Sequence, residues 1–155
     1  MATQGPRAVI ETKFGEIELE FLADKAPGHV KNFLDLANKK FYDGQRVYRV
    51  EPNFVVQFGD PQSKTLPMDH PRMGSGGPGY TIKAEFNKRP FERGVLGMAR
   101  TSDPDSAGSQ VYLMLGPAPH LNGKYTAFGK VATGMGVVDQ IRVGDRIKSI
   151  RIVTP

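Results

Sequence analysis

Polar and apolar residues alternate along much of this 155-residue chain, which is typical of β-strands with one buried face. In residues 8–22, AVIETKFGEIELEFL, the apolar side chains Ile17, Leu19 and Phe21 fall on one face and the intervening glutamates on the other. Residues near Gly15 suit a turn, so this region predicts a hairpin with one solvated face. Similar runs predict strands at residues 46–51, 54–59, 94–99, 110–115, 127–131 and 148–153.

Two stretches follow the helical period instead. In residues 26–40 apolar side chains recur at i, i+3, i+4 and i+7, and Pro27 suits the first turn of a helix. His29 falls outside this apolar stripe, so we expect it on the exposed side of the helix. A second, shorter helix is predicted within residues 134–141, where apolar side chains again share a face.

The segment from residue 61 to residue 79 shows no periodicity and is rich in glycine and proline, which predicts a long surface loop. About eight strands with two helices favour a closed antiparallel β-barrel, because closure removes the edge strands that promote aggregation. At this length we predict a single domain over residues 1–155. A closed barrel without long exposed edges also predicts a monomer.

Composition narrows the possible chemistry. The chain has no cysteine, which excludes disulfides, thiolate metal sites and thiol catalysis. The N-terminal residues lack the apolar core of a signal peptide, and no run reaches the roughly 18 apolar residues of a membrane span, so we expect a cytoplasmic protein without membrane association. The formal net charge of +5 would attract anionic partners, but basic and acidic residues are interspersed, which disfavours nucleic-acid binding as the main function.

Familiar motifs for cofactors and nucleophiles are incomplete. Residues 74–79, GSGGPG, match the GxGxxG spacing of dinucleotide-binding loops, yet a strand-like segment follows where that fold has a helix. His29, His70 and His120 lack the spacing of metal ligands. Ser109 lies outside the GxSxG context of hydrolases. We therefore predict neither a cofactor nor a metal.

Residues 48–60, YRVEPNFVVQFGD, have the composition of a buried strand but include an arginine and a glutamine, which are costly to bury without partners. Pro52 and Asn53 favour a turn, and a hairpin centred on Asn53 places Arg49 opposite Gln57. The glutamine carbonyl can then accept a hydrogen bond from the guanidinium and fix its plane. From this stretch alone, an exposed pair on a solvated sheet face is an equal alternative.

Two further segments combine polar and aromatic side chains in the same way. In GMARTSDPDSAGSQVYLML, residues 97–115, Gln110 and Tyr112 share a strand face, and HLNGKYTAFGKV follows at residues 120–131. Together with RVEPNFVVQFGD and GSGGPGYTIKAEF, these blocks resemble the cyclophilin family of peptidyl-prolyl cis-trans isomerases. The resemblance runs in order from about residue 8 to residue 153.

The resemblance implies a barrel of about eight antiparallel strands capped by two helices, and rotation of the peptide bond that precedes proline, without a cofactor. Arg49 matches the family's catalytic arginine, and Gln57 matches the glutamine that orients it. The implied partners are proline-containing peptides and unfolded or partly folded proteins, whose folding the enzyme would assist. Positions implied to line the proline slot or hold the peptide carry Phe54, Val55, Gly74, Ala99, Arg100, Gln110, Tyr112, His120, Leu121 and Tyr125.

Several of these positions depart from the common eukaryotic pattern and look more like bacterial members. Val55 stands in place of methionine, Arg100 of asparagine, Tyr112 of phenylalanine, Tyr125 of histidine and His120 of tryptophan. Because the arginine and glutamine are kept, we expect isomerisation to survive. Loss of the indole N–H and its apolar face predicts weaker binding of the inhibitor cyclosporin.

Two other functions stay open. A cyclophilin-like barrel could hold proline-containing segments without turning them over, and a basic protein could associate with nucleic acid in a salt-dependent manner. Arg49 argues against the first, because inactive members of the family commonly lack it. The interspersed charge argues against the second. The positive charge of Arg100 also suggests a preference for acidic segments next to proline.

Overall fold

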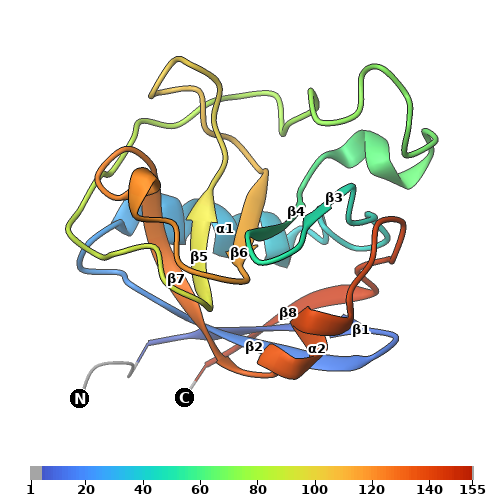
Figure 1. The fold of residues 1–155 in the computed structure, drawn as a ribbon, viewed down its shortest axis with the longest axis horizontal. Coiled ribbons are helices and arrows are strands. Elements are labelled where there is room, and N and C mark those ends of the chain that lie inside the picture. The colour runs from blue at the N-terminus through green and yellow to red at the C-terminus, as the bar shows by residue number, and fades with distance from the viewer. Residues whose placement is uncertain (1–4, 155) are drawn as a thin grey trace.

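The computed structural model describes residues 5–154 and consists mainly of antiparallel β structure (Figure 1). Its two α-helices cover different parts of one sheet, and two short 3₁₀ helices lie in the connections. The strands and helices are β1 (Arg7–Thr12), β2 (Gly15–Phe21), α1 (Pro27–Asn38), β3 (Arg49–Glu51), β4 (Val55–Phe58), η1 (Pro61–Lys64), β5 (Val95–Met98), β6 (Val111–Met114), η2 (Pro119–Leu121), β7 (Thr126–Thr133), α2 (Met135–Gln140) and β8 (Ser149–Val153). Within residues 5–154, no helix is both long and apolar enough to cross a membrane.

The sheet has eight strands in the order β3-β4-β6-β5-β7-β2-β1-β8, and it curls strongly without closing through its outer strands. Strands β3 and β8 do not pair with each other. Instead, the chain just before each of them meets: the N–H of Val47 donates to the carbonyl of Asp145, and the N–H of Gly144 donates to the carbonyl of Val47. The prediction of a fully closed barrel is therefore corrected to a curled sheet whose gap is bridged by loop backbone, because β3 is only three residues long.

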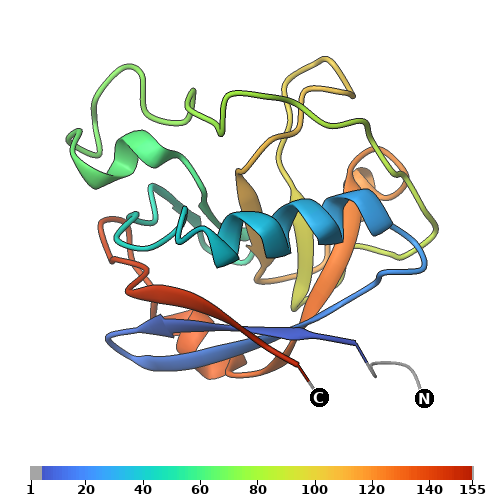
Figure 2. The same ribbon diagram turned by 180° about the vertical axis from the view of Figure 1, so that it is seen from behind.

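The first and last strands of the chain lie side by side. Strand β1 pairs with both β2 and β8, and in the second pair Arg7 lies opposite Val153. Figures 1 and 2 show these two ends on the same side of the molecule, away from the loop that joins β5 to β6. The hairpin predicted from the alternating N-terminal pattern is confirmed, with Thr12 opposite Gly15 at its turn.

The central strands are buried on both faces. On the face toward α1, which crosses the sheet in Figure 2, Val56, Phe58 and Leu113 belong to one large apolar cluster. On the other face, Val55 and Tyr112 belong to a second, smaller cluster. Because side chains alternate along a strand, each of these strands contributes to both clusters. The second cluster forms the base of the candidate site.

The predicted elements are confirmed in their order along the chain, and several strands are shorter than predicted. The predicted strand at residues 46–51 is regular only from Arg49, and Arg46 makes an isolated bridge to Arg146. The predicted loop at residues 61–79 is irregular apart from η1. The helix with Pro27 in its first turn is confirmed as α1.

The prediction that His29 is exposed is wrong, because its side chain is completely buried. Its ring lies 5.9 Å from the ring of Phe128, measured between centroids, and its Nδ1 is 2.7 Å from Oε1 of Glu85. The Glu85 carboxylate also accepts hydrogen bonds from the N–H groups of Gly28 and His29 at the start of α1. The irregular segment that carries Glu85 therefore covers a helix face that the periodicity marked as polar.

Burial of His29 makes the fold sensitive to acid. Burial lowers the pKa of His29 below its ordinary 6.5, outweighing the opposing hydrogen bond and charge of Glu85. As the pH falls, His29 therefore takes up a proton in the unfolded chain before it does so in the folded one. The neutral imidazole contributes fully to the free energy of unfolding above pH 6.5, and this contribution is lost below that pH. We expect thermal melting temperatures to fall from about pH 7.5 to about pH 5.5.

A variant separates this residue from other titrating groups. His29→Phe should show a flatter dependence of melting temperature on pH, because it lacks the buried imidazole. His70→Phe, which alters a histidine in the irregular loop, should keep the wild-type slope. Equal slopes in all three proteins would contradict the assignment to His29.

Candidate active site

The β3–β4 hairpin places Arg49 and Gln57 directly opposite each other, as the sequence predicts. The turn between the strands includes Asn53, whose φ of 63° lies in the left-handed region that asparagine tolerates better than most residues. Nη1 of Arg49 donates to Oε1 of Gln57 over 3.0 Å. The hydrogen bond inferred from the sequence is thus present, and it fixes one end of the guanidinium.

Two further groups contact the Arg49 guanidinium. Its Nε and Nη2 bind the carboxylate of Glu51, in a pair whose side chains are 42% and 48% exposed. Such exposed pairs contribute little, because water and salt screen them. The Arg49 Cζ also lies 5.7 Å from the centre of the Phe54 ring. The cation is therefore partly paired yet borders an apolar surface.

A pocket of about 300 Å³ opens beside Arg49. Buried side chains of Val55, Tyr112 and Leu121 belong to the cluster below it. Ten of the twelve predicted site residues line this pocket: Arg49, Phe54, Val55, Gln57, Ala99, Arg100, Tyr112, His120, Leu121 and Tyr125. Segments distant in the sequence are thus brought together by β3, β4, β6 and the connections around η2.

The base of the pocket depends on a glycine beneath an aromatic ring. Gly97 on β5 lies opposite Tyr112 on β6, and a Cβ at residue 97 would lie 2.6 Å from the Tyr112 ring. The ring can therefore lie against the β5 backbone only because residue 97 has no side chain. Burial raises the pKa of Tyr112 above its ordinary value. The phenol stays neutral and the base of the pocket stays uncharged.

The rim of the pocket is held by Arg100 and the aromatic residues. The Arg100 guanidinium lies 4.5 Å from the centre of the Tyr125 ring and donates to the carbonyl of Lys124 over 2.8 Å. His120 lies against Phe54, with ring centroids 5.9 Å apart. Within residues 5–154, the main-chain N–H and C=O of Arg100 make no hydrogen bond. Both groups are available to an extended chain.

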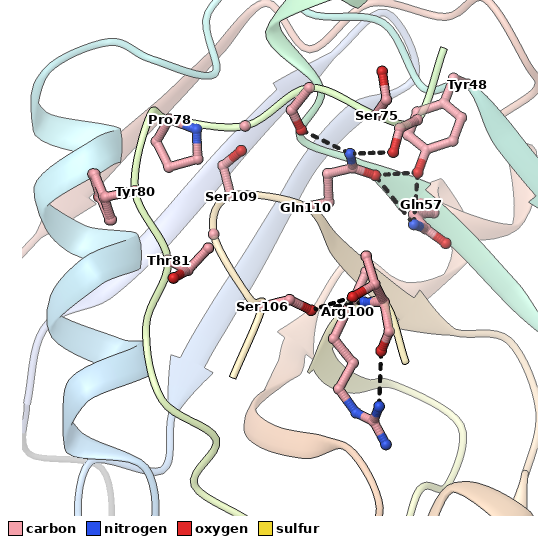
Figure 3. Close-up of a pocket in the computed structure, with 16 residues that line it drawn as sticks. Tyr48, Gln57, Ser75, Pro78, Tyr80, Thr81, Arg100, Ser106, Ser109 and Gln110 are labelled. Atoms are coloured by element: carbon pink, nitrogen blue, oxygen red, sulfur yellow. Dashed lines mark hydrogen bonds between the residues drawn. The ribbon is translucent and has the colours of Figure 1, made fainter. Parts of the chain in front are cut away.

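A second pocket of about 380 Å³ continues from the first, and it is drawn in Figure 3. Gln57, Ala99 and Arg100 border both pockets, so the two form one groove. The remaining two predicted site residues, Gly74 and Gln110, line the second pocket. Nε2 of Gln110 donates to the carbonyl of Gly74 over 2.7 Å, so these two residues also contact each other.

Tyr48 and Asp60 are missed by the sequence analysis, although their hydrogen bonds hold the groove in place. Tyr48 binds both Gln57 and Gln110 through its hydroxyl group, as Figure 3 shows. Asp60 is completely buried and accepts hydrogen bonds from the N–H groups of Gly74 and Gly76. The signal for Asp60 is its position before Pro61, since an aspartate before proline often begins a helix, as η1 does here.

Comparison with known proteins agrees with this architecture. Residues 7–154 match the family described as cyclophilin type peptidyl-prolyl cis-trans isomerase/CLD. The chain is 43% identical over 139 residues to peptidyl-prolyl cis-trans isomerase B of Bacillus subtilis, in an alignment that covers 88% of this chain and 90% of the relative. It is 40% identical over 150 residues to a peptidyl-prolyl cis-trans isomerase of Synechococcus elongatus, covering 96% and 97%.

A solved structure extends the match to three dimensions. The crystal structure of a Cryptosporidium parvum cyclophilin type peptidyl-prolyl cis-trans isomerase superposes with a TM-score of 0.82 at 27% identity, over 99% of each chain. The family model matches residues 7–154, and the two bacterial relatives are 43% and 40% identical over 88% and 96% of this chain. This chain therefore belongs to the cyclophilin-type peptidyl-prolyl cis-trans isomerases.

Proposed function

We propose that this chain accelerates rotation about Xaa-Pro bonds in peptides and proteins, with Arg49 as the catalytic residue. The observation that carries the proposal is the position of the Arg49 guanidinium, which is bonded to Gln57 and lies beside a pocket of about 300 Å³ with an apolar base. The pocket offers an apolar surface to a proline ring. The guanidinium offers a cationic donor next to it.

Rotation requires no covalent intermediate. Amide resonance sets a barrier of about 18–20 kcal/mol to rotation. In the twisted transition state the prolyl nitrogen loses conjugation and regains a lone pair. A hydrogen bond from Arg49 to that nitrogen stabilises the twisted state more than either planar state, which is the requirement for catalysis. Gln57 fixes the guanidinium and its amide group can contact the substrate carbonyl.

The groove suits an extended peptide that contains proline. With proline in the first pocket, the neighbouring residues would cross Ala99 and Arg100, where the main chain of Arg100 can pair with the peptide. The related Cryptosporidium parvum enzyme, 28% identical, was also crystallised in the presence of the dipeptide Ala-Pro. We propose proline-containing peptides and partly folded proteins as substrates, and assistance of protein folding as the role.

Exchange NMR on a short Ala-Pro peptide tests this function. Catalytic amounts of the protein should bring cis-trans exchange, which takes tens to hundreds of seconds uncatalysed, into the millisecond range. Binding of the peptide without faster exchange would make the groove a recognition site and would contradict the proposal. The single domain over residues 1–155, the monomeric state and the cytoplasmic location stay predictions.

Cyclosporin provides a test of the rim. We expect weaker cyclosporin binding than in relatives with tryptophan at residue 120, because the exposed His120 offers a smaller apolar face. His120→Trp should lower the dissociation constant for cyclosporin by about tenfold, which corresponds to the free energy of about one buried hydrogen bond. Isothermal titration measures this effect. Val143→Trp, at an exposed position outside the groove, should change nothing, and an unchanged affinity in His120→Trp would contradict the prediction.

A further inference from the structure

A continuous chain of hydrogen bonds runs from Arg49 into the molecule. Nη1 of Arg49 donates to Oε1 of Gln57 over 3.0 Å, and Nε2 of Gln57 donates to the Tyr48 oxygen over 2.6 Å. The Tyr48 hydroxyl in turn donates to Oε1 of Gln110. These side chains come from β3, β4 and the residues just before β3 and β6. The Tyr48 hydroxyl bridges the two glutamines, and Nε2 of Gln57 also contacts Oε1 of Gln110 directly over a longer 3.4 Å, as Figure 3 shows.

The chain continues through the glycine-rich loop to a buried carboxylate. Nε2 of Gln110 donates to the carbonyls of Gly74 and Gly76 over 2.7 and 2.9 Å. The N–H groups of these glycines donate to Oδ2 of Asp60 over 2.7 and 3.2 Å. Gly74 has a φ of 94°, and a Cβ at Gly76 would overlap the Asp60 carboxylate. The loop therefore needs its glycines to approach Asp60.

The direction of every bond in this chain follows from the loop backbone. Two main-chain carbonyls face the Gln110 amide, and carbonyls only accept, so its NH₂ group points to the loop and its oxygen points to Tyr48. The Tyr48 hydroxyl must then donate to Gln110, which leaves its lone pairs for the NH₂ group of Gln57. The Gln57 carbonyl oxygen is thereby turned toward Arg49.

We propose that Tyr48 is a positioning residue for Arg49, acting through the orientation of the Gln57 amide. Without the hydroxyl, the Gln57 NH₂ group keeps only its longer, 3.4 Å hydrogen bond to Oε1 of Gln110. The Gln57 amide is then held less firmly against a half-turn rotation that would present its NH₂ group to the guanidinium, donor against donor. Glu51 also binds Arg49, but this exposed pair is screened by solvent. The partly buried chain therefore fixes the guanidinium beside the pocket.

The charges at the two ends support this arrangement. The glycine-rich loop links Gln110 to the completely buried Asp60, and the aligned hydrogen bonds from Arg49 to Gln110 strengthen one another. Burial and the nearby Asp60 raise the pKa of Tyr48 to about 12, against the opposing influence of Arg49 and Gln57. The hydroxyl therefore keeps its proton and stays a donor at physiological pH.

Tyr48→Phe removes only the hydroxyl and tests the inference, which rests on the proposed isomerase function. We expect kcat for an Ala-Pro peptide to fall about tenfold with KM changed by less than about twofold, because the pocket is intact and orientation matters most in the transition state. In NMR spectra recorded without substrate, the side-chain signals of Gln57 Nε2 and Arg49 Nε should shift. This second measurement does not depend on turnover.

A matched control distinguishes positioning from loss of stability. Tyr42 is completely buried outside the groove, and its hydroxyl donates to the carbonyl of Ser109 over 2.8 Å. Tyr42→Phe makes the same chemical change, so it should lower the melting temperature while kcat stays at the wild-type value. An equal loss of kcat in Tyr42→Phe would show that the effect is structural and would overturn the proposal.

A double variant tests the route through Gln57. If Tyr48 acts through this residue, Tyr48→Phe should have no further effect on kcat in a Gln57→Ala background. The same tenfold loss of kcat in the wild-type and Gln57→Ala backgrounds would contradict the proposal that Tyr48 acts through Gln57. A wild-type kcat and unshifted side-chain signals in Tyr48→Phe would refute the positioning role while leaving the isomerase intact. Full activity in Arg49→Ala would instead refute the proposed mechanism.

Discussion

Arg49→Ala is expected to lower kcat/KM for an Ala-Pro peptide by a factor of about 100 to 1,000, the range seen when an enzyme loses one preorganised donor to its transition state. The methyl side chain cannot donate to the prolyl nitrogen, while Val55, Tyr112 and Leu121 still form the pocket. Peptide binding should therefore weaken much less than turnover. Exchange NMR at several peptide concentrations separates the two effects.

Two further variants sharpen the assignment of Arg49. Arg49→Lys keeps the positive charge but lacks the planar guanidinium group that binds Gln57. Its activity should therefore lie between the activities of the wild type and of Arg49→Ala. Arg151 on β8 also pairs with a glutamate, Glu16, at 3.1 Å, and Arg151→Ala should keep full activity. An Arg49→Ala protein with native melting temperature and more than half of the wild-type rate would contradict the mechanism.

Phe128→Ala is expected to lower the free energy of unfolding by about 3–5 kcal/mol, the usual cost of removing a buried phenylalanine. Phe128 is fully buried on β7, and its ring centre lies 5.9 Å from those of Phe33 and His29 on α1. Its loss leaves a cavity between helix and sheet. Urea denaturation measures the change.

The exposed Phe86, with 43% of its surface accessible, provides the control for this prediction. Phe86→Ala should change the free energy of unfolding by less than about 0.5 kcal/mol. Because Phe128 belongs to the cluster on the helix side and the pocket to the other cluster, the folded fraction of Phe128→Ala should retain its kcat. Similar losses of stability in both variants would contradict the assignment of Phe128 to the core.

The sequence was sufficient for features that depend on local chemistry. The turn at Pro52 and Asn53 set the register of the β3–β4 hairpin, and that register alone placed Arg49 opposite Gln57. The pocket could be predicted only through the resemblance to a family, because its walls come from segments far apart in the chain. No periodicity relates Phe54 in the β3–β4 turn to His120 in η2.

Other features depend on tertiary contacts that no local pattern records. Strand alternation would put Tyr48 on the face opposite Arg49, but regular strand geometry begins only at Arg49, so Tyr48 is able to contact Gln57. His29 is buried by a segment more than fifty residues away, since Glu85 lies 56 positions later. The sheet is not closed by its strands, because loop backbone just before β3 pairs with loop backbone before β8.

The pairing of β1 with β8 has a mechanical consequence. Arg7 lies opposite Val153, so a load applied to these two residues pulls the strands apart at right angles to their length. Interstrand hydrogen bonds in an antiparallel pair also run perpendicular to the strands, so they break one pair after another rather than all together. When force is applied between Arg7 and Val153, β1 and β8 therefore separate one residue pair at a time, and the force needed to unfold the sheet in this direction is low.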